Sequence, residues 1–215
     1  MTLVRALLLM EKKVAFVSNR SENNWNLWTM NLDGSNQKQL LKTGAQWDIN
    51  CSKTENSIYF FGATEEQQGV WKISLDSGEL KFITGNQTFK VGFSPDEKYL
   101  AYSFWDEEKK QLAQEIYTIA TGERRRFELP ISAVGEGQNE PSVKWTPDGQ
   151  NFSFINAEKG VSNIWTQPLK GGKPTKVTDF KEYSIYNYDW SADGKKIVLA
   201  RGKVNNDVVL MTKEK

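Results

Sequence analysis

Apolar and polar residues alternate in short runs along most of this chain, and one run recurs as a unit. Its clearest copy is Asn26–Ser35, in which alternating residues lead into an Asp-Gly-Ser turn. Similar runs follow at 70–78, 115–122 and 163–172, and a weaker one at 207–211. Alternation over about four to eight residues predicts a half-buried strand, and the Asp-Gly or Gly-Gly ending predicts a hairpin.

The recurring strands have the spacing of a radial β structure. The aromatic anchors of the first four follow one another at intervals of 43, 46 and 48 residues: Trp28, Trp71, Tyr117 and Trp165. Self-similarity at roughly this period, with strand and turn content, is typical of propeller blades. Because these anchors share one position in the unit, we expect them in the core between blades, where flat sheets need wide side chains.

A turn signal lies upstream of most anchors. The segments Phe93–Tyr102, 145–154 and 190–199 each join a turn containing Asp to an apolar run, and 50–60 fills the same slot without proline. Proline presets φ at the second turn position, and aspartate can accept a hydrogen bond from its own turn. Each unit is therefore predicted to be strand, turn, strand, variable loop, anchor strand, hairpin and a final polar strand.

These patterns predict an all-β fold, a β-propeller of four-stranded antiparallel blades with about five repeat units over 13–215. We place the units at about 13–46, 47–88, 89–138, 139–184 and 185–215, after an N-terminal extension or extra strand over 1–12. Residues 3–9 suit either the first strand of the first blade or a last strand of the fifth. Five units in an open arc would expose both terminal sheets, so we expect part of a propeller of about six to eight blades.

The final strand of each unit carries Lys or Arg, as at 37–41, 80–84, 125–129 and 174–178. Lysine commonly protects exposed sheet edges against pairing with other chains, so we interpret these charges as edge protection. The only run of three basic residues, Arg124–Arg126, is expected in a solvated turn.

The composition argues against a nucleic-acid partner and against membrane insertion, and it contains a single cysteine. The chain has 28 Lys and Arg against 27 Asp and Glu, a net charge of +1, which argues against a nucleic-acid partner. The longest aliphatic run, Ala6–Met10, is far shorter than the roughly 18 residues of a membrane span, so no membrane insertion is expected. Cys51 is the only cysteine, and we expect it to be a small buried residue of an inner strand.

Side chains for catalysis are scarce. The chain has no histidine, which excludes a Ser-His-Asp triad and His-based zinc sites. It also lacks a G-x-S-x-G elbow, a P-loop and a dinucleotide fingerprint. We therefore expect no enzyme activity, no cofactor and no metal site here. The remaining route is a carboxylate pair drawn from Asp48, Glu140 and Asp189, which lie at or near inner strands.

At Asn26–Ser35 and Phe93–Tyr102 the chain resembles the TolB-like β-propeller repeat family. The family pattern is roughly F-S-P-D-G-K-x-I-A-F, a spacer, and I-Y-V-M-N-x-D-G-S, and the resemblance extends over about 13–210. The chain departs from this pattern at Glu97, which replaces Gly, and around Ser52, where the turn motif is lost. Ala192 in place of Pro is a further departure.

The C-terminal part, around Ile164–Leu169 and 189–195, is similar to the propellers that end many bacterial multi-domain sensors. In those proteins the propeller follows a Ser/Thr kinase or a winged-helix domain. The resemblance implies a non-catalytic binding or scaffold domain, the sensor or protein-interaction part of a bacterial signalling protein. The compartment would be extracytoplasmic on a membrane-anchored sensor and cytoplasmic otherwise. Two alternatives stay open: a periplasmic TolB-like component of the Tol-Pal system, and the non-catalytic propeller of a prolyl-oligopeptidase-type peptidase.

The segments that lead into the inner strands are expected to converge on one face around the axis. They mix aromatic, amide and charged side chains, which suits the capture of a protein, a peptide or a small ligand. The candidate binding residues are Trp47, Asp48, Phe89, Lys90, Asn139, Glu140, Tyr186 and Asn187.

Overall fold

The computed structural model describes residues 4–10, 13–21, 24–41, 47–63, 67–85, 88–130 and 143–203. These residues form strands and turns, and the regular elements among them are all β. No helix in the described ranges is long and apolar enough to cross a membrane. The prediction of an all-β chain is confirmed.

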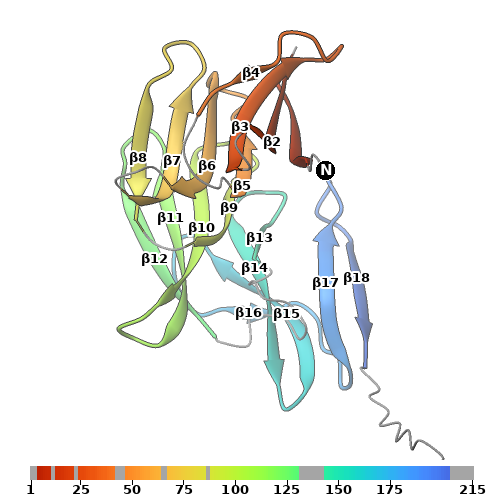
Figure 1. Ribbon diagram of the computed structural model, residues 1–215. Coiled ribbons are helices and arrows are strands. Elements are labelled where there is room, and N and C mark those ends of the chain that lie inside the picture. Colours follow the sequence, from red (N-terminus) through yellow and green to blue (C-terminus); the bar gives the residue numbers. More distant parts are fainter. Residues whose placement is uncertain are drawn as a thin grey trace, which may run out of the picture.

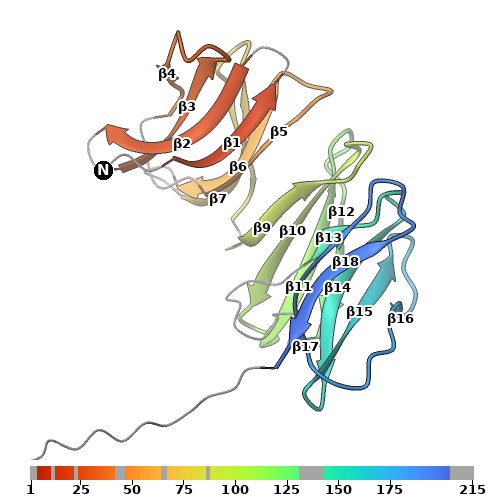
Figure 2. The ribbon, with the colours of Figure 1, turned by 90° about the vertical axis from the view of Figure 1, so that its right-hand side faces the viewer.

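The strands form successive antiparallel sheets that follow one another in an arc (Figures 1 and 2). The first sheet contains β1 (Val4–Met10), β2 (Lys13–Ser21), β3 (Asn24–Asn31) and β4 (Lys38–Gln39). The second contains β5 (Trp47–Cys51), β6 (Ser57–Ala63), β7 (Gln68–Ser74) and β8 (Leu80–Thr84). The third contains β9 (Thr88–Phe93), β10 (Tyr99–Asp106), β11 (Gln111–Thr118) and β12 (Arg124–Leu129). The fourth contains β13 (Lys144–Trp145), β14 (Asn151–Glu158), β15 (Val161–Pro168) and β16 (Thr175–Lys176).

The described part of the fifth sheet is the hairpin of β17 (Ser184–Trp190) and β18 (Ile197–Gly202). The strand predicted at 207–211 lies outside the described residues. At the other end, β1 pairs with β2 from Met10 opposite Lys13 to Val4 opposite Ser18. Residues 4–10 are therefore the first strand of the first sheet, one of the two places that the sequence allows.

The turns between the first and second strands form as the sequence indicates. In the third sheet, Ser94 Oγ donates to the Asp96 carboxylate at 2.8 Å, and the backbone N–H of Lys98 donates to the same oxygen. Asp148 and Asp193 accept the equivalent bonds in the fourth and fifth sheets. An aspartate that accepts from its own turn fixes the reversal of the chain, so the two strands leave it antiparallel.

The core lies between the sheets. Alternate residues of each strand face the sheet before and the sheet after, so each interface collects side chains from two blades. Trp71 packs with residues of the first sheet such as Ala15 and Val17, and Tyr117 packs with residues of the second. Both are buried, and Trp165 packs against the cluster between the third and fourth sheets. The predicted burial of these anchors between blades is confirmed, but Tyr117 does not share the position of the other three. The equivalent backbone bonds of Leu75, Ile119 and Leu169 put Glu115 in register with Trp71 and Trp165, and Tyr117 two residues further along.

Trp28 occupies the same blade position on the face of the first sheet that points away from the second. It stacks on Phe16 with ring centroids 6.4 Å apart, and the Arg20 guanidinium lies over both rings. Arg20 also donates to Ser18 Oγ at 3.0 Å and to Gln37. A cation over two aromatic faces covers apolar surface that no described blade covers.

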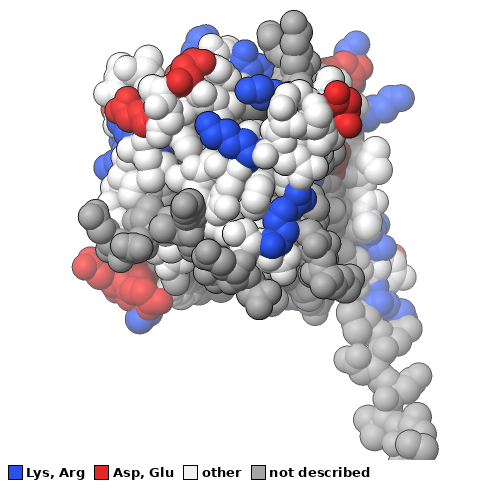
Figure 3. All heavy atoms as spheres, turned by 45° about the horizontal axis from the view of Figure 1, so that its top comes forward, with Lys and Arg blue, Asp and Glu red and all other residues white. Residues whose placement is uncertain are grey.

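Charges on the outer strands do not gather into one basic patch. Lys and Arg side chains are spread among uncharged residues on the face shown in Figure 3, and Lys38, Lys81 and Lys176 are exposed. Arg124–Arg126, expected in a solvated turn, instead open strand β12. Arg124 donates to the carbonyl of Ile83 in the second sheet, and Arg125 donates to that of Leu169 in the fourth at 2.7 Å. This outer strand thus contacts both neighbouring blades.

Candidate functional site

The inner strands of four sheets border one hollow of about 510 Å³, which we name the inner hollow. β1, β5 and β9 lie side by side at the inner edges of their sheets, and β13 and β17 continue the series (Figure 1). The hollow is lined from four blades, by residues that include Asn50, Lys53, Gly92, Lys144, Trp145 and Asp189.

Opposite charges face each other in the inner hollow. Lys144 Nζ lies 3.2 Å from the Asp189 carboxylate and 5.5 Å from the centroid of the Tyr188 ring. The Asp189 side chain is 75% exposed, so this ion pair is open to solvent and to a ligand. Lys53 is exposed at the same hollow and carries a second positive charge. The arrangement suits a polar ligand with groups of both signs.

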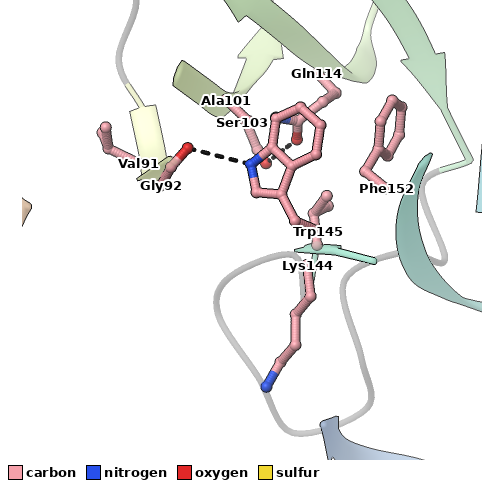
Figure 4. A pocket seen from close by; sticks show the side chains of 9 residues that line it. Val91, Gly92, Ala101, Ser103, Gln114, Lys144, Trp145 and Phe152 are labelled. Atoms are coloured by element: carbon pink, nitrogen blue, oxygen red, sulfur yellow. Dashed lines mark hydrogen bonds between the residues drawn. The ribbon is translucent and has the colours of Figure 1, made fainter. Parts of the chain in front are cut away.

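Trp145 forms a fixed wall of the inner hollow between the third and fourth blades. Its Nε1–H donates to the carbonyl of Gly92 at 3.3 Å, across the interface (Figure 4). Its ring stacks on Tyr99 of the third sheet, with an interplanar angle of 22°. An indole held on one edge and one face presents a rigid apolar surface, which is typical of binding sites.

Cys51 lies in β5 at the edge of the inner hollow and is half-buried. Burial raises the pKa of its thiol to about 12. The thiolate at pH 8 is then on the order of a thousandfold scarcer than for an ordinary thiol. We expect iodoacetamide to modify the native chain far more slowly than the urea-unfolded chain, measured by mass spectrometry over time. Equal rates would contradict this placement of the thiol.

Four of the predicted binding residues lie at the starts of β5 and β9, whereas the inner hollow is lined from the ends of these two strands. Trp47 and Asp48 begin β5, and Phe89 and Lys90 lie in the first half of β9. Tyr186 is half-buried in β17, and Asn187 is exposed. Asn139 and Glu140 lie outside the described residues.

The residues that line the inner hollow come from where each inner strand meets its turn. Lys144 and Trp145 directly precede the Thr-Pro-Asp-Gly turn, and Asp189 lies two residues before Ser191. The predicted binding residues were drawn from the segments that enter these strands, and none of them is among the described residues that line the inner hollow. The signal available was a charged or aromatic residue just before the turns of the third, fourth and fifth blades. No three Asp, Glu or Cys side chains in the described part of the chain lie close enough to hold a metal ion.

Comparison with known proteins matches a family model, described as the TolB beta propeller domain, over residues 9–215. Among curated proteins, dipeptidyl-peptidase 5 of Porphyromonas gingivalis is 23% identical over 155 residues, which are 68% of this chain and 20% of that protein. A component of eukaryotic translation initiation factor 3 from Drosophila virilis is 27% identical over 165 residues, 69% of this chain and 24% of that protein. The chain thus spans about a quarter or less of these relatives.

Solved structures agree on the fold. The putative TolB of Agrobacterium tumefaciens superposes with a TM-score of 0.64 at 19% identity, over 94% of this chain and 70% of that one. The β-propeller domain of the Trilobed protease from Pyrococcus furiosus gives 0.69 at 18% identity, over 92% and 63%. At these identities the similarity concerns the fold alone. It is consistent with blades arranged around a common axis.

Proposed function

Because the chain belongs to the TolB β-propeller family, we propose that it is a binding module that captures an extended peptide segment of a partner protein in the inner hollow. In this role it is non-catalytic and serves as the sensor or scaffold part of a larger bacterial signalling protein. Propellers collect side chains from several blades around their axis, so one ligand can be contacted by residues far apart in sequence.

The observation that carries the proposal is the lining of the inner hollow by four successive blades. Lys53, Lys144 and Asp189 come from three different sheets, and Trp145 supplies a fixed aromatic wall. Backbone amides and side chains of a peptide need donors, acceptors and an apolar surface together, and this lining offers all three.

A peptidase-associated role is the second candidate. It is favoured by the similarity to dipeptidyl-peptidase 5 of Porphyromonas gingivalis and to the acylaminoacyl peptidase of Pyrococcus horikoshii, which superposes with a TM-score of 0.65. In such a protein the propeller would bind substrate peptide, and chemistry would lie in another domain. A role like that of TolB itself, in the envelope, is a third candidate on the family match. All three share peptide or protein capture.

The test uses random linear peptides displayed on phage and selected on the folded chain. Selected peptides are then synthesised, and their dissociation constants are measured by fluorescence anisotropy. Lys53→Glu and Asp189→Lys reverse exposed charges in the inner hollow, so each is expected to weaken binding about tenfold without changing Tm appreciably.

Matched controls reverse exposed charges on the second blade away from the inner hollow. Lys81→Glu and Glu79→Lys both change residues that are exposed beside β8 or within it. They are expected to bind the selected peptides as the wild type does. Peptides that bind all four variants equally well would refute capture in the inner hollow.

A further inference from the structure

One buried cross-strand pair is polar at a position where the other three four-stranded sheets have apolar pairs. In each four-stranded sheet, the second and third strands present a facing pair of residues to the next blade. The pairs are Val17–Leu27, Phe61–Val70, Ser103–Gln114 and Ile155–Ile164. All eight residues are buried, and the pair of the third sheet is polar whereas the other three are apolar. A buried polar pair where packing alone would select aliphatic side chains indicates a role other than stability.

The amide of Gln114 is only partly satisfied. Gln114 and Ser103 are each 1% exposed. Ser103 Oγ donates to Gln114 Oε1 at 2.6 Å, and the Gln114 amide nitrogen donates no hydrogen bond to the described residues. Gln114 lines a cavity, and its amide N–H has no acceptor among the described residues. A ligand in this cavity can supply that acceptor.

Gln114 and Ser103 line a cavity of about 50 Å³ between the third and fourth blades, which we name the side pocket (Figure 4). Ala101, Phe152 and the Trp145 indole form its apolar walls. One water occupies about 10–15 Å³ of such volume, so the side pocket has room for a few waters or for one short side chain.

The side pocket shares part of its lining with the inner hollow. Gly92, Lys144 and Trp145 line both, together with Val91 and Val143. A Cβ added at Gly92 would meet no atom within 4 Å, so the backbone leaves the entrance open. Lys144, the charged residue of the lining, extends away from Gln114 in Figure 4 and pairs with Asp189. The interior of the side pocket is therefore uncharged.

We propose that the side pocket receives an asparagine side chain of the peptide bound in the inner hollow. The asparagine oxygen accepts the free N–H of Gln114, and its amide group donates to the Ser103 hydroxyl, which keeps acceptor capacity. A neutral carboxamide fits better than a carboxylate, because burying a charge without a counter-charge is unfavourable. This inference rests on the proposed function and names the residue that the site selects.

The test uses two variants and the linear peptides selected by phage display on the wild-type chain. Gln114→Met keeps the length of the side chain and removes the donor. The double variant S103V/Q114I gives the third blade an apolar pair like Ile155–Ile164, fills the side pocket and is expected to raise Tm. A raised or unchanged Tm shows that a change in binding does not come from unfolding.

We expect selected peptides to share one asparagine. Replacing that asparagine by leucine, and introducing Gln114→Met, should each weaken binding about tenfold, and the two changes together should cost little more than either alone. Peptides without a shared asparagine, or binding unchanged in both variants, would overturn the side-pocket assignment. If Lys53→Glu and Asp189→Lys still weaken binding in that case, the proposed function stands. If no variant weakens binding, or no peptide is selected, both proposals are wrong.

Discussion

Replacing Gly69 by alanine is expected to lower the free energy of unfolding by about 3 kcal/mol. Gly69 lies in β7, and a Cβ at this position would stand 2.0 Å from the carbonyl oxygen of Thr84 and 2.8 Å from the Phe82 ring. The first contact is with backbone, so it cannot be relieved by turning a side chain. β8 would have to move away from β7 at the point where their register shifts, between Val70 and Trp71.

The matched control for this change is Gly92→Ala. Gly92 also lies in a strand, β9, and a Cβ there meets nothing within 4 Å. Since alanine restricts the unfolded chain more than glycine does, this variant is expected to change stability by less than about 1 kcal/mol, in either direction. Urea unfolding followed by tryptophan fluorescence measures both. An equal loss in the two variants would show that the close approach of β8 to Gly69 is not the cause.

The fold was predictable because its signals are local. An aspartate that accepts hydrogen bonds from its own turn, as Asp96, Asp148 and Asp193 do, needs only a few neighbouring residues. The alternation of apolar residues then places the strands. The need for glycine at position 69 was not predictable, because it depends on the carbonyl of Thr84, whose approach is fixed by pairing and not by the sequence around Gly69.

The site was harder to predict than the fold. The inner hollow depends on which end of each inner strand faces it, and alternation does not specify that. The Ser103–Gln114 pair was in principle visible, since it replaces apolar residues at a repeated position. Recognising it requires the register of β10 against β11, which only the pairing of the two strands defines. For the same reason, two departures from the repeat that looked independent are connected in space.

Glu97 and the turn around Ser52 are these two departures, and they compensate each other. Glu97 stands where the next two blades have Gly149 and Gly194, and it adopts their left-handed conformation, with φ of 53°. Its carboxylate reaches the second blade, where it accepts from Ser52 Oγ and the Lys53 N–H, both at 2.8 Å. Glu97 therefore accepts hydrogen bonds from the turn of the second blade, as an aspartate within the turn does in the third, fourth and fifth blades.

Replacing Glu97 by alanine is expected to lower the free energy of unfolding by about 2–3 kcal/mol. The backbone N–H of Thr54 also donates to this carboxylate, so several donors lose their acceptor at once. Glu97→Gly loses the same bonds but relieves the left-handed backbone, which favours glycine by about 1 kcal/mol. Glycine, the residue of the family pattern, should therefore still be less stable than the wild type and more stable than alanine. A glycine variant more stable than the wild type would refute the contact between the blades.

The acid dependence of stability tests the charge of Glu97 separately. Partial burial raises the pKa of this carboxyl, but the hydrogen bonds from Ser52, Lys53 and Thr54 outweigh burial and hold it below its ordinary value of 4.5. A lowered pKa in the folded state contributes stability above pH 4.5, and that contribution is lost as the pH falls through the folded-state pKa. The stability difference between the wild type and Glu97→Gln, measured by urea unfolding, should be constant from about pH 7 to 5.5 and shrink below that. Other carboxylates titrate in both proteins and cancel in the difference, so a difference that does not change with pH would mean that the ionised form of Glu97 does not hold the two blades together.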